Sequence, residues 1–238
     1  MLVKTTHRTN ATEIMDDFAM EGKMLIDALD KIAKINQLLG GNKLTLQGVK
    51  NLLSKETSNK EVIIVDIGCG NGDMLRKLAD YGSDTNRNLK LIGIDANQFT
   101  IHHAKGLSTL YPNISYQCED IFDGKFKTLK YDIVLCTLTL HHFKEDEIIQ
   151  LIDILYKNAN IGIVINDLER SAVAYRLFQG LCFLFGLNEM SRKDGLVSIL
   201  RGFKKEELLA FSKKLDLKKY TIDWKWAFRY QWIIQKNT

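Results

Sequence analysis

The sequence predicts an α/β fold: a doubly wound, mostly parallel seven-stranded sheet with helices on both faces and an antiparallel strand pair at the C-terminus. Two observations predict it. Short β-branched, apolar runs recur between residues 62 and 166, and helical stretches separate them, as is typical of a parallel sheet buried on both faces. From residue 220 to residue 232, apolar residues alternate with mostly polar ones, which indicates a final antiparallel pair.

The composition supports one folded unit rather than a disordered or linker-rich chain. The 238 residues are 45% hydrophobic and 26% charged, with a single proline, which is enough to bury a full core. The net charge of +4 is spread along the chain without a block of one sign, so a nucleic-acid partner is not expected. The four cysteines are scattered without a C-x-x-C pair, which argues against a disulfide framework or a zinc site.

No targeting or membrane signal stands out. The N-terminal residues lack the apolar core and cleavage site of a secretory signal. The longest apolar stretch, Leu177 to Leu187, is interrupted by polar and glycine residues and is too short to span a bilayer. We therefore expect a cytoplasmic protein without a membrane span.

The first sixty residues are expected to form a helical lid segment, followed by a main domain over residues 61–238. Apolar residues recur with a helical period from Leu25 to Leu39, and Gly40 and Gly41 follow where a helix end is expected. A shorter amphipathic stretch runs from Leu46 to Leu53, and a polar run over 54–60 closes the segment.

In the main domain, strands and helices alternate. The strands are expected over 62–67, 90–95, 114–118, 131–137 and 161–166, and the helices around 74–78, 99–110 and 145–156. A longer segment then interrupts this rhythm before a helix near Lys204. It contains an amphipathic helical run and lies after the carboxyl end of a strand, where α/β folds carry substrate-facing structure. We therefore expect an inserted helical cap at about 169–203.

A glycine-rich turn follows the first parallel strand, in the sequence Asp66-Ile67-Gly68-Cys69-Gly70-Asn71-Gly72-Asp73. Glycines here let the backbone approach a ligand, and the first βα turn of such folds binds nucleotides. The third glycine comes one residue too early for a dinucleotide fingerprint, and Asp73 would repel a diphosphate. No P-loop motif is present. An adenosine ligand that carries positive charge and no phosphate fits better.

Two further acidic positions follow the next strands. Asp95 ends the second strand, where a carboxylate can accept both hydroxyls of a ribose; the alternative is a helix N-cap. After the third strand, Asp120 could bind the exocyclic amine of an adenine while Ile121 packs on its face.

Together these motifs resemble the Rossmann-like S-adenosylmethionine-dependent methyltransferases, from residue 60 to the end of the chain. The resemblance implies S-adenosyl-L-methionine as the cofactor. It also implies cofactor contacts from residues in the glycine turn, at the ends of the second and third strands and in the fourth strand: Asp66, Gly68, Cys69, Gly70, Asp95, Ala96, Asp120, Ile121 and Cys136.

The fourth strand leads into Thr137-Leu138-Thr139-Leu140-His141-His142-Phe143, which resembles the Leu-His-His loop of ubiquinone/menaquinone-type methyltransferases. We expect His142 to act as a general base, because imidazole titrates near neutrality. Asp167 on the fifth strand would orient His142 or serve as an alternative base. The other histidine would be structural. His102 and His103 are expected on a helix surface, and no metal site is expected.

Segments around Asp167, Asp194 and Arg201, with Ile14 to Asp17 near the start, resemble a bacterial branch of methyltransferases associated with polyketide or quinone-like aromatics. Asp167, Arg170 and Arg201 would then line a polar substrate pocket. The alternative is that Asp167 and Arg170 cap helices and pair with each other. The resemblance implies a small-molecule substrate and O-methylation of a phenolic or polyketide-like aromatic.

Other interpretations of function stay open at this point. They are C-methylation of a quinol-like ring, methylation of RNA or protein, and a non-catalytic module that binds S-adenosylmethionine. The sequence also leaves the oligomeric state open, a homodimer included.

Overall fold

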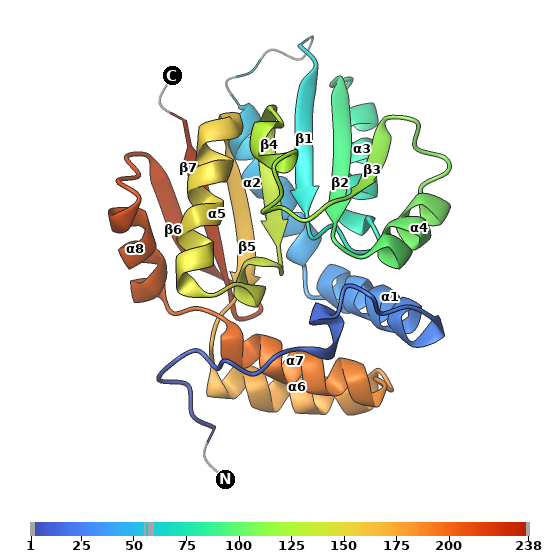
Figure 1. Ribbon diagram of the computed structural model, residues 1–238, viewed down its shortest axis with the longest axis vertical. Helices are drawn as coiled ribbons and strands as arrows, with labels where there is room; N and C mark the ends of the chain where they lie inside the picture. The colour runs from blue at the N-terminus through green and yellow to red at the C-terminus, as the bar shows by residue number, and fades with distance from the viewer. Residues whose placement is uncertain (1–2, 55, 57–59, 237–238) are drawn as a thin grey trace.

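The centre of the molecule is one seven-stranded sheet, seen in a computed structural model that describes residues 3–54, 56 and 60–236 (Figure 1). The strand order is β3-β2-β1-β4-β5-β7-β6. The strands β1 to β5 pair in parallel, and β7 is antiparallel to both β5 and β6, so the predicted fold class is confirmed. The strands are β1 (Val62–Ile67), β2 (Leu89–Asp95), β3 (Ile114–Cys118), β4 (Tyr131–Thr137), β5 (Ala159–Leu168), β6 (Tyr220–Lys225) and β7 (Arg229–Gln235).

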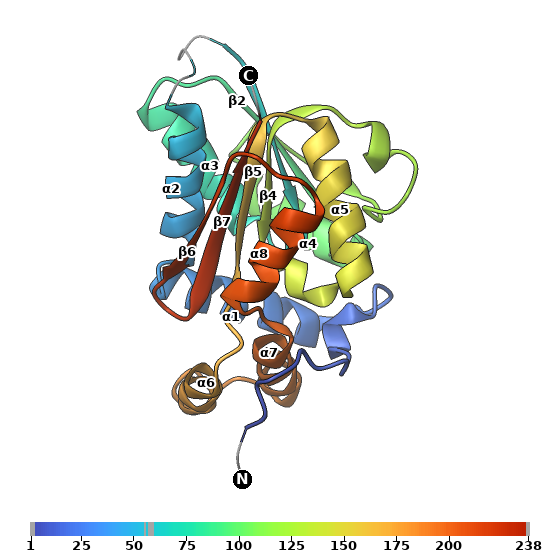
Figure 2. The same cartoon turned by 90° about the vertical axis from the view of Figure 1, so that its left-hand side faces the viewer.

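Helices cover both faces of this sheet (Figure 2). One face packs against α2 (Gly41–Leu53), α3 (Asp73–Asp84) and α4 (Gln98–Leu107). The other face packs against α5 (Glu145–Asn158) and α8 (Lys205–Lys214). Alternate side chains of each central strand enter the two apolar cores, which is why these strands have apolar residues at nearly every position.

The helix α2 corrects part of the expected N-terminal lid. Its residues Val49, Leu52 and Leu53 are buried in the core between sheet and helices, and Gly48 lies against Val164 of β5. Residues 41–53 therefore cover a face of the sheet, because the apolar side of α2 packs against β5 and β7. The polar run expected at 54–60 lies partly outside the described residues, at positions 55 and 57–59.

Beyond the carboxyl ends of the parallel strands lie α1 (Lys23–Leu38), α6 (Ala172–Leu184) and α7 (Glu189–Arg201) (Figure 1). The last two form the inserted segment expected at about 169–203. Residues 3–22, which we call the N-terminal strap, cross α7 and contain the short 3₁₀ helix η1 (Ile14–Asp16). Two further 3₁₀ helices are η2 (Phe126–Thr128) and η3 (Leu140–His142).

The turn between the final strands, which the sequence pattern did not place, lies at Trp226–Phe228. The alternation of apolar residues therefore continues through the turn. Trp232 is fully buried on β7, whereas Trp226 at the turn is 65% exposed. Within the described part of the chain, the helices are all too short or too polar to cross a bilayer.

Candidate functional site

A cavity of about 1260 Å³ lies between the carboxyl ends of the strands and the lid helices. Ligand pockets usually occupy about 300–1,000 Å³, so this space is large enough for two molecules. Its walls come from the N-terminal strap, α1, the loops after β1, β2, β3 and β4, and the helices α6 and α7. This is the edge of an open α/β sheet where ligands bind.

The glycine turn forms one wall of the cavity. Gly68, Gly70 and Gly72 all have a positive φ, of 64°, 52° and 77°, a conformation that side chains disfavour. At Gly72 a Cβ atom would collide with the Tyr116 hydroxyl, and at Gly68 with Thr139. At Gly70 the nearest heavy atom would be 3.8 Å away. The turn therefore presents open backbone to the cavity at Gly70 and packs tightly on either side.

Asp95 lies at the end of β2 and lines the cavity beside the glycine turn. Its carboxylate accepts hydrogen bonds from the backbone N–H of Gly70 (3.2 Å) and of Asn97 (3.0 Å). The N-cap alternative for Asp95 is wrong, because the Asn97 side chain caps α4 by accepting from Thr100 N. Burial raises the pKa of Asp95, and the two backbone hydrogen bonds partly offset that rise.

The other residues expected to contact a cofactor divide into two groups. Asp66, Cys69, Ala96, Asp120 and Ile121 line the cavity with the glycines and Asp95. Ile121 is buried, and Asp120 is exposed with one carboxylate oxygen accepting from Phe122 N.

Cys136 does not line the cavity. It is fully buried in the core beneath α5, because β4 turns this side chain toward that face of the sheet. The expected cofactor contact from Cys136 is therefore corrected.

Asp66 is a buried acid without a complete set of partners. It is 3% exposed, and its Oδ1 atom has no hydrogen-bond partner among the described residues. Burial raises the pKa of Asp66 well above its usual value, and the nearby carboxylates of Asp73 and Asp95 add to the rise. An unpaired buried acceptor is unusual in proteins and calls for a ligand, water or ion.

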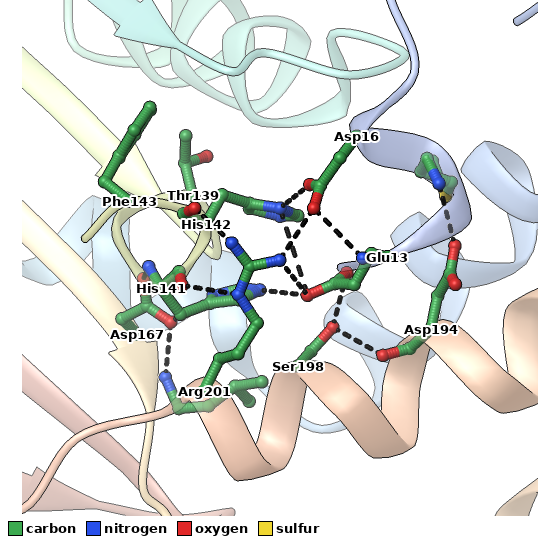
Figure 3. Close-up of polar contacts among 12 residues, drawn as sticks. Glu13, Asp16, Thr139, His141, His142, Phe143, Asp167, Asp194, Ser198 and Arg201 are labelled. Carbon is green, nitrogen blue, oxygen red and sulfur yellow. Dashed lines mark hydrogen bonds and ion pairs between the residues drawn. The ribbon is translucent and has the colours of Figure 1, made fainter. Parts of the chain in front are cut away.

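The two adjacent histidines of η3 have different partners (Figure 3). His141 is buried, with Nδ1 2.7 Å from Asp167 Oδ1, and its backbone N–H donates to Asp167 Oδ2. His142 is half-buried, with Nδ1 2.6 Å from Asp16 Oδ1. The expected pairing of His142 with Asp167 is therefore wrong. Asp167 is buried and does not line the cavity, because His141 lies between Asp167 and the cavity.

Arg201 lies beside the histidines and lines the cavity. Its Nη1 is 2.7 Å from Asp16 Oδ2 and 3.6 Å from Glu13 Oε1. Its other guanidinium N–H groups donate to the backbone carbonyls of His141 and His142. Arg201 therefore joins α7, η3 and the N-terminal strap in one polar cluster.

Glu13 and Asp16 complete this cluster and were not identified from the sequence. Burial raises the pKa of Glu13 to about 7. For Asp16, burial also favours the neutral form, but hydrogen bonds from His142 and Arg201 outweigh it and hold the pKa well below its usual range. Asp194 of α7 accepts the backbone N–H groups of Ile14 and Met15 and so fixes both acids over the cavity.

Two buried acceptors face each other in the cluster. Within the described ranges, neither Glu13 Oε1 nor His141 Nε2 has a hydrogen-bond partner, and the two atoms are 3.6 Å apart. With His142 they bring three metal-ligand atoms within 4.8 Å of one another, a grouping that the sequence did not suggest. The Arg201 guanidinium already supplies positive charge there, so we interpret the cluster as a polar network. Outside this cluster, on α4, His103 Nε2 lies 2.9 Å from Asp30 Oδ1.

Arg170 does not line the cavity, contrary to the expectation from the sequence. It is 1% exposed and forms a two-pronged ion pair with Glu207 of α8. It also donates to the carbonyls of Gly202, Thr5 and Thr6. The alternative pairing of Arg170 with Asp167 is wrong as well. Arg170 is an anchor for the N-terminal strap.

The cavity is acidic although the chain as a whole carries a net charge of +4. Acidic side chains outnumber basic ones among its lining residues. The basic ones are Arg8, Lys144, Arg201 and Arg229. The cavity therefore favours neutral or cationic ligands over polyanions.

Comparison with known proteins agrees with this geometry. Residues 64–162 match the family model described as a methyltransferase domain. This part of the chain therefore resembles a methyltransferase domain. Within it lie the glycine turn, Asp95, Asp120 and both histidines, whereas Glu13, Asp16, Asp167 and Arg201 lie outside it. The local polar partners of the histidines are therefore set by segments beyond the methyltransferase domain.

Among curated proteins, the methyltransferase domain is similar to the protein-lysine N-methyltransferase EFM4 of Saccharomyces cerevisiae. The two are 42% identical over 80 residues, or 32% of this chain and 33% of that protein. The match thus spans about a third of the length of this curated relative.

Solved structures resemble a larger part of the chain. The plantazolicin methyltransferase BpumL in complex with S-adenosylhomocysteine has a TM-score of 0.66 at 20% identity, covering 88% of this chain and 89% of its own. The magnesium protoporphyrin IX methyltransferase ChlM from Synechocystis PCC 6803, with bound S-adenosylmethionine, has a TM-score of 0.54 at 15% identity, covering 93% and 88%. The overall fold is therefore that of S-adenosylmethionine-dependent methyltransferases.

Proposed function

We propose that the protein is an S-adenosyl-L-methionine-dependent methyltransferase that methylates the hydroxyl of a phenolic or polyketide-like aromatic small molecule. One observation carries the proposal: the glycine turn with Asp95, the histidine His142 and the apolar lid all face the same cavity. A cofactor and an acceptor can therefore lie side by side there, which is the arrangement that direct transfer between two ligands needs.

The residues of the cofactor half suit S-adenosylmethionine. Gly70 leaves room against the backbone, Asp95 has acceptor capacity for a ribose, and Ile121 is an apolar surface for an adenine. The unpaired Oδ1 of Asp66 offers an acceptor to a cationic ligand. When bound, the cofactor would supply an electrophilic sulfonium methyl group.

His142 is the proposed base. Because Asp16 accepts from Nδ1, the lone pair of His142 lies on Nε2. This nitrogen could take the proton of an acceptor hydroxyl as the methyl group is transferred. His141 is less suited, because its ring is buried between Asp167 and Glu13. Asp167 then orients His141 rather than acting as a base itself.

The rival substrates gain less support. C-methylation of a quinol-like ring would use the same cavity and a carbon nucleophile. The similarity to a lysine methyltransferase covers only part of the chain. The acidic lining disfavours RNA. We also propose that the enzyme acts in the cytoplasm on a free small molecule.

A binding and turnover experiment tests the proposal. Calorimetry should show that S-adenosylhomocysteine binds at least a hundredfold more tightly than NAD, and S-adenosylmethionine with a panel of alkyl- and acylphenols should yield S-adenosylhomocysteine. Equal affinity for NAD and S-adenosylhomocysteine would overturn the cofactor assignment. Cofactor binding without turnover of any phenol, but with turnover of a quinol or an amine, would replace the acceptor.

A further inference from the structure

The cavity has two chemically different regions beyond the glycine turn. Its polar end contains Glu13, Asp16, His142 and Arg201. The opposite region lies between α1 and α6, and its walls are almost entirely aliphatic and aromatic side chains. They are Leu25, Leu29, Ile32 and Ile35 from α1 and Ala174, Leu177, Phe178, Leu181 and Leu184 from α6.

The apolar region is longer than a single aromatic ring requires. On α6 the lining residues extend from Ala174 to Leu184, and a helix rises about 1.5 Å per residue, so this wall is about 15 Å long. The two helices meet through Ile35 and Cys182, together with Leu187 of the loop that follows α6, and all three residues are buried. We call the apolar part of the cavity that is lined by these two helices the channel.

The rim of the channel is apolar and exposed. Phe18 is 58% exposed, Leu177 53% and Leu184 75%, and all three line the cavity. Exposed apolar side chains that share one concave surface mark a binding site more often than a solvated one.

We infer that the acceptor is an amphiphile, with its methylated hydroxyl at the polar end and an extended alkyl or fused-ring body lying between α1 and α6 as far as Leu184. This inference rests on the proposed function, because it takes the polar end to hold the reacting hydroxyl. It adds the shape of the substrate: a compact phenol fills only the first part of the channel, whereas a long apolar body covers the rim.

Gly180 provides a way to shorten the channel. It lies on α6, lines the cavity, and a Cβ atom there would meet nothing within 4 Å. A side chain at this position therefore starts in open space, and leucine suits a helix better than glycine. Gly106 on α4 is the matched control, because it is also helical with nothing within 4 Å but does not line the cavity.

The experiment compares 4-methylphenol, 4-butylphenol and 4-octylphenol on the enzyme loaded with S-adenosylhomocysteine. Calorimetry should show affinity rising at least thirtyfold from the methyl to the octyl compound. Gly180→Leu should weaken binding of 4-octylphenol tenfold or more and leave 4-methylphenol within twofold, whereas Gly106→Leu should match the wild type. Circular dichroism checks that both variants fold.

The outcomes separate this inference from the proposed function. Affinity that does not depend on chain length, or a Gly180→Leu variant that binds 4-octylphenol like the wild type, overturns the inference even if phenols are methylated. Chain-length-dependent binding that Gly180→Leu removes, but without methylation of any phenol, supports the channel and overturns the phenolic acceptor instead. A rim that serves to dock a protein would show no chain-length dependence, which also overturns the inference.

Discussion

Two histidines that are neighbours in sequence have opposite environments in this protein. His141 is 2% exposed and bonded to Asp167 of β5, whereas His142 contacts Asp16 of the N-terminal strap and faces the cavity. The two rings lie side by side, with centroids 4.3 Å apart, but one ring is bonded to the sheet and the other to the N-terminal strap at the wall of the cavity.

His142→Ala should lower kcat about a hundredfold or more, because an un-ionised phenol at neutral pH needs a proton acceptor. The loss should shrink as the pH rises toward the phenol pKa of about 10 and the substrate ionises by itself. Rate measurements across this pH range, with calorimetry of S-adenosylhomocysteine binding as a control, check it. A variant that loses cofactor affinity would assign His142 a structural role, and one with full kcat at pH 7 would remove the base.

Glu13→Gln should become more stable relative to the wild type as the pH rises. Burial raises the folded-state pKa of Glu13 from 4.5 to about 7, so between these values the native state holds a proton that the unfolded chain has released. Native stability therefore falls with rising pH in this window. Urea unfolding at about pH 5 and pH 8 should shift the difference by on the order of 1–3 kcal/mol in favour of the variant. Parallel pH profiles would contradict the buried acid.

Asp95→Ala should weaken binding of S-adenosylhomocysteine by about 1.5–3 kcal/mol, because a charged acceptor of the ribose hydroxyls is lost. The matched control is Asp80→Ala, which removes an exposed acid on α3 away from the cavity. Calorimetry of both variants measures the difference. Unchanged affinity in Asp95→Ala would separate this acid from the cofactor site.

The position of the glycine turn and of Asp95 at one cavity could be predicted, whereas the partners of the histidines could not. Asp95 follows the glycine turn at a spacing that the parallel sheet fixes. Asp16 is 126 positions away from His142 in the chain, and only the path of the N-terminal strap brings them together. The two candidate acids on β5 and on the strap have the same chemistry, so residue type alone could not choose between them.

Among the elements, the strands were easiest to predict. The bounds of β1, β3 and β4 agree with the sequence expectation, and β2 starts one residue earlier, at Leu89. The β-branched apolar runs of a doubly covered sheet leave little choice of register. The helix α2 was placed wrongly because an amphipathic stripe shows that a helix has a buried side but does not show which surface it covers.

Deletion of residues 1–18 should abolish turnover and keep most of the affinity for S-adenosylhomocysteine. The deletion removes Glu13 and Asp16 and leaves α1 and the glycine turn in place. Product formation and calorimetry on the truncated enzyme give the two readouts. Full activity in this truncated form would exclude the N-terminal strap from the site.

At the scale of the whole molecule, the N-terminal segment is part of the main fold. Asn166 of β5 donates to the Gly41 carbonyl, Gln231 of β7 donates to the Leu44 carbonyl, and Arg229 donates to Asn36. All three bonds join the sheet to α1 and α2 or to the turn between them, and they are partly or fully buried.

A chain of residues 61–238 should therefore fail to fold, because the face of β5 and β7 that α2 covers would be exposed. The chain of residues 19–238, which keeps α2, should unfold in a single cooperative transition like the intact protein. Far-UV circular dichroism with thermal melts compares the two. A folded 61–238 fragment with a sharp transition would show that this part of the chain folds without the N-terminal helices.

The acidic lining of the cavity in a molecule of positive net charge also affects how ligands are exchanged. S-adenosylmethionine carries a sulfonium cation, and its by-product S-adenosylhomocysteine does not. The negative potential of the cavity therefore attracts the cationic cofactor. It attracts the by-product less once the methyl group has been transferred, which favours release of the by-product. Added salt screens this field, so cofactor capture should slow at high ionic strength while the departure of the by-product stays nearly constant.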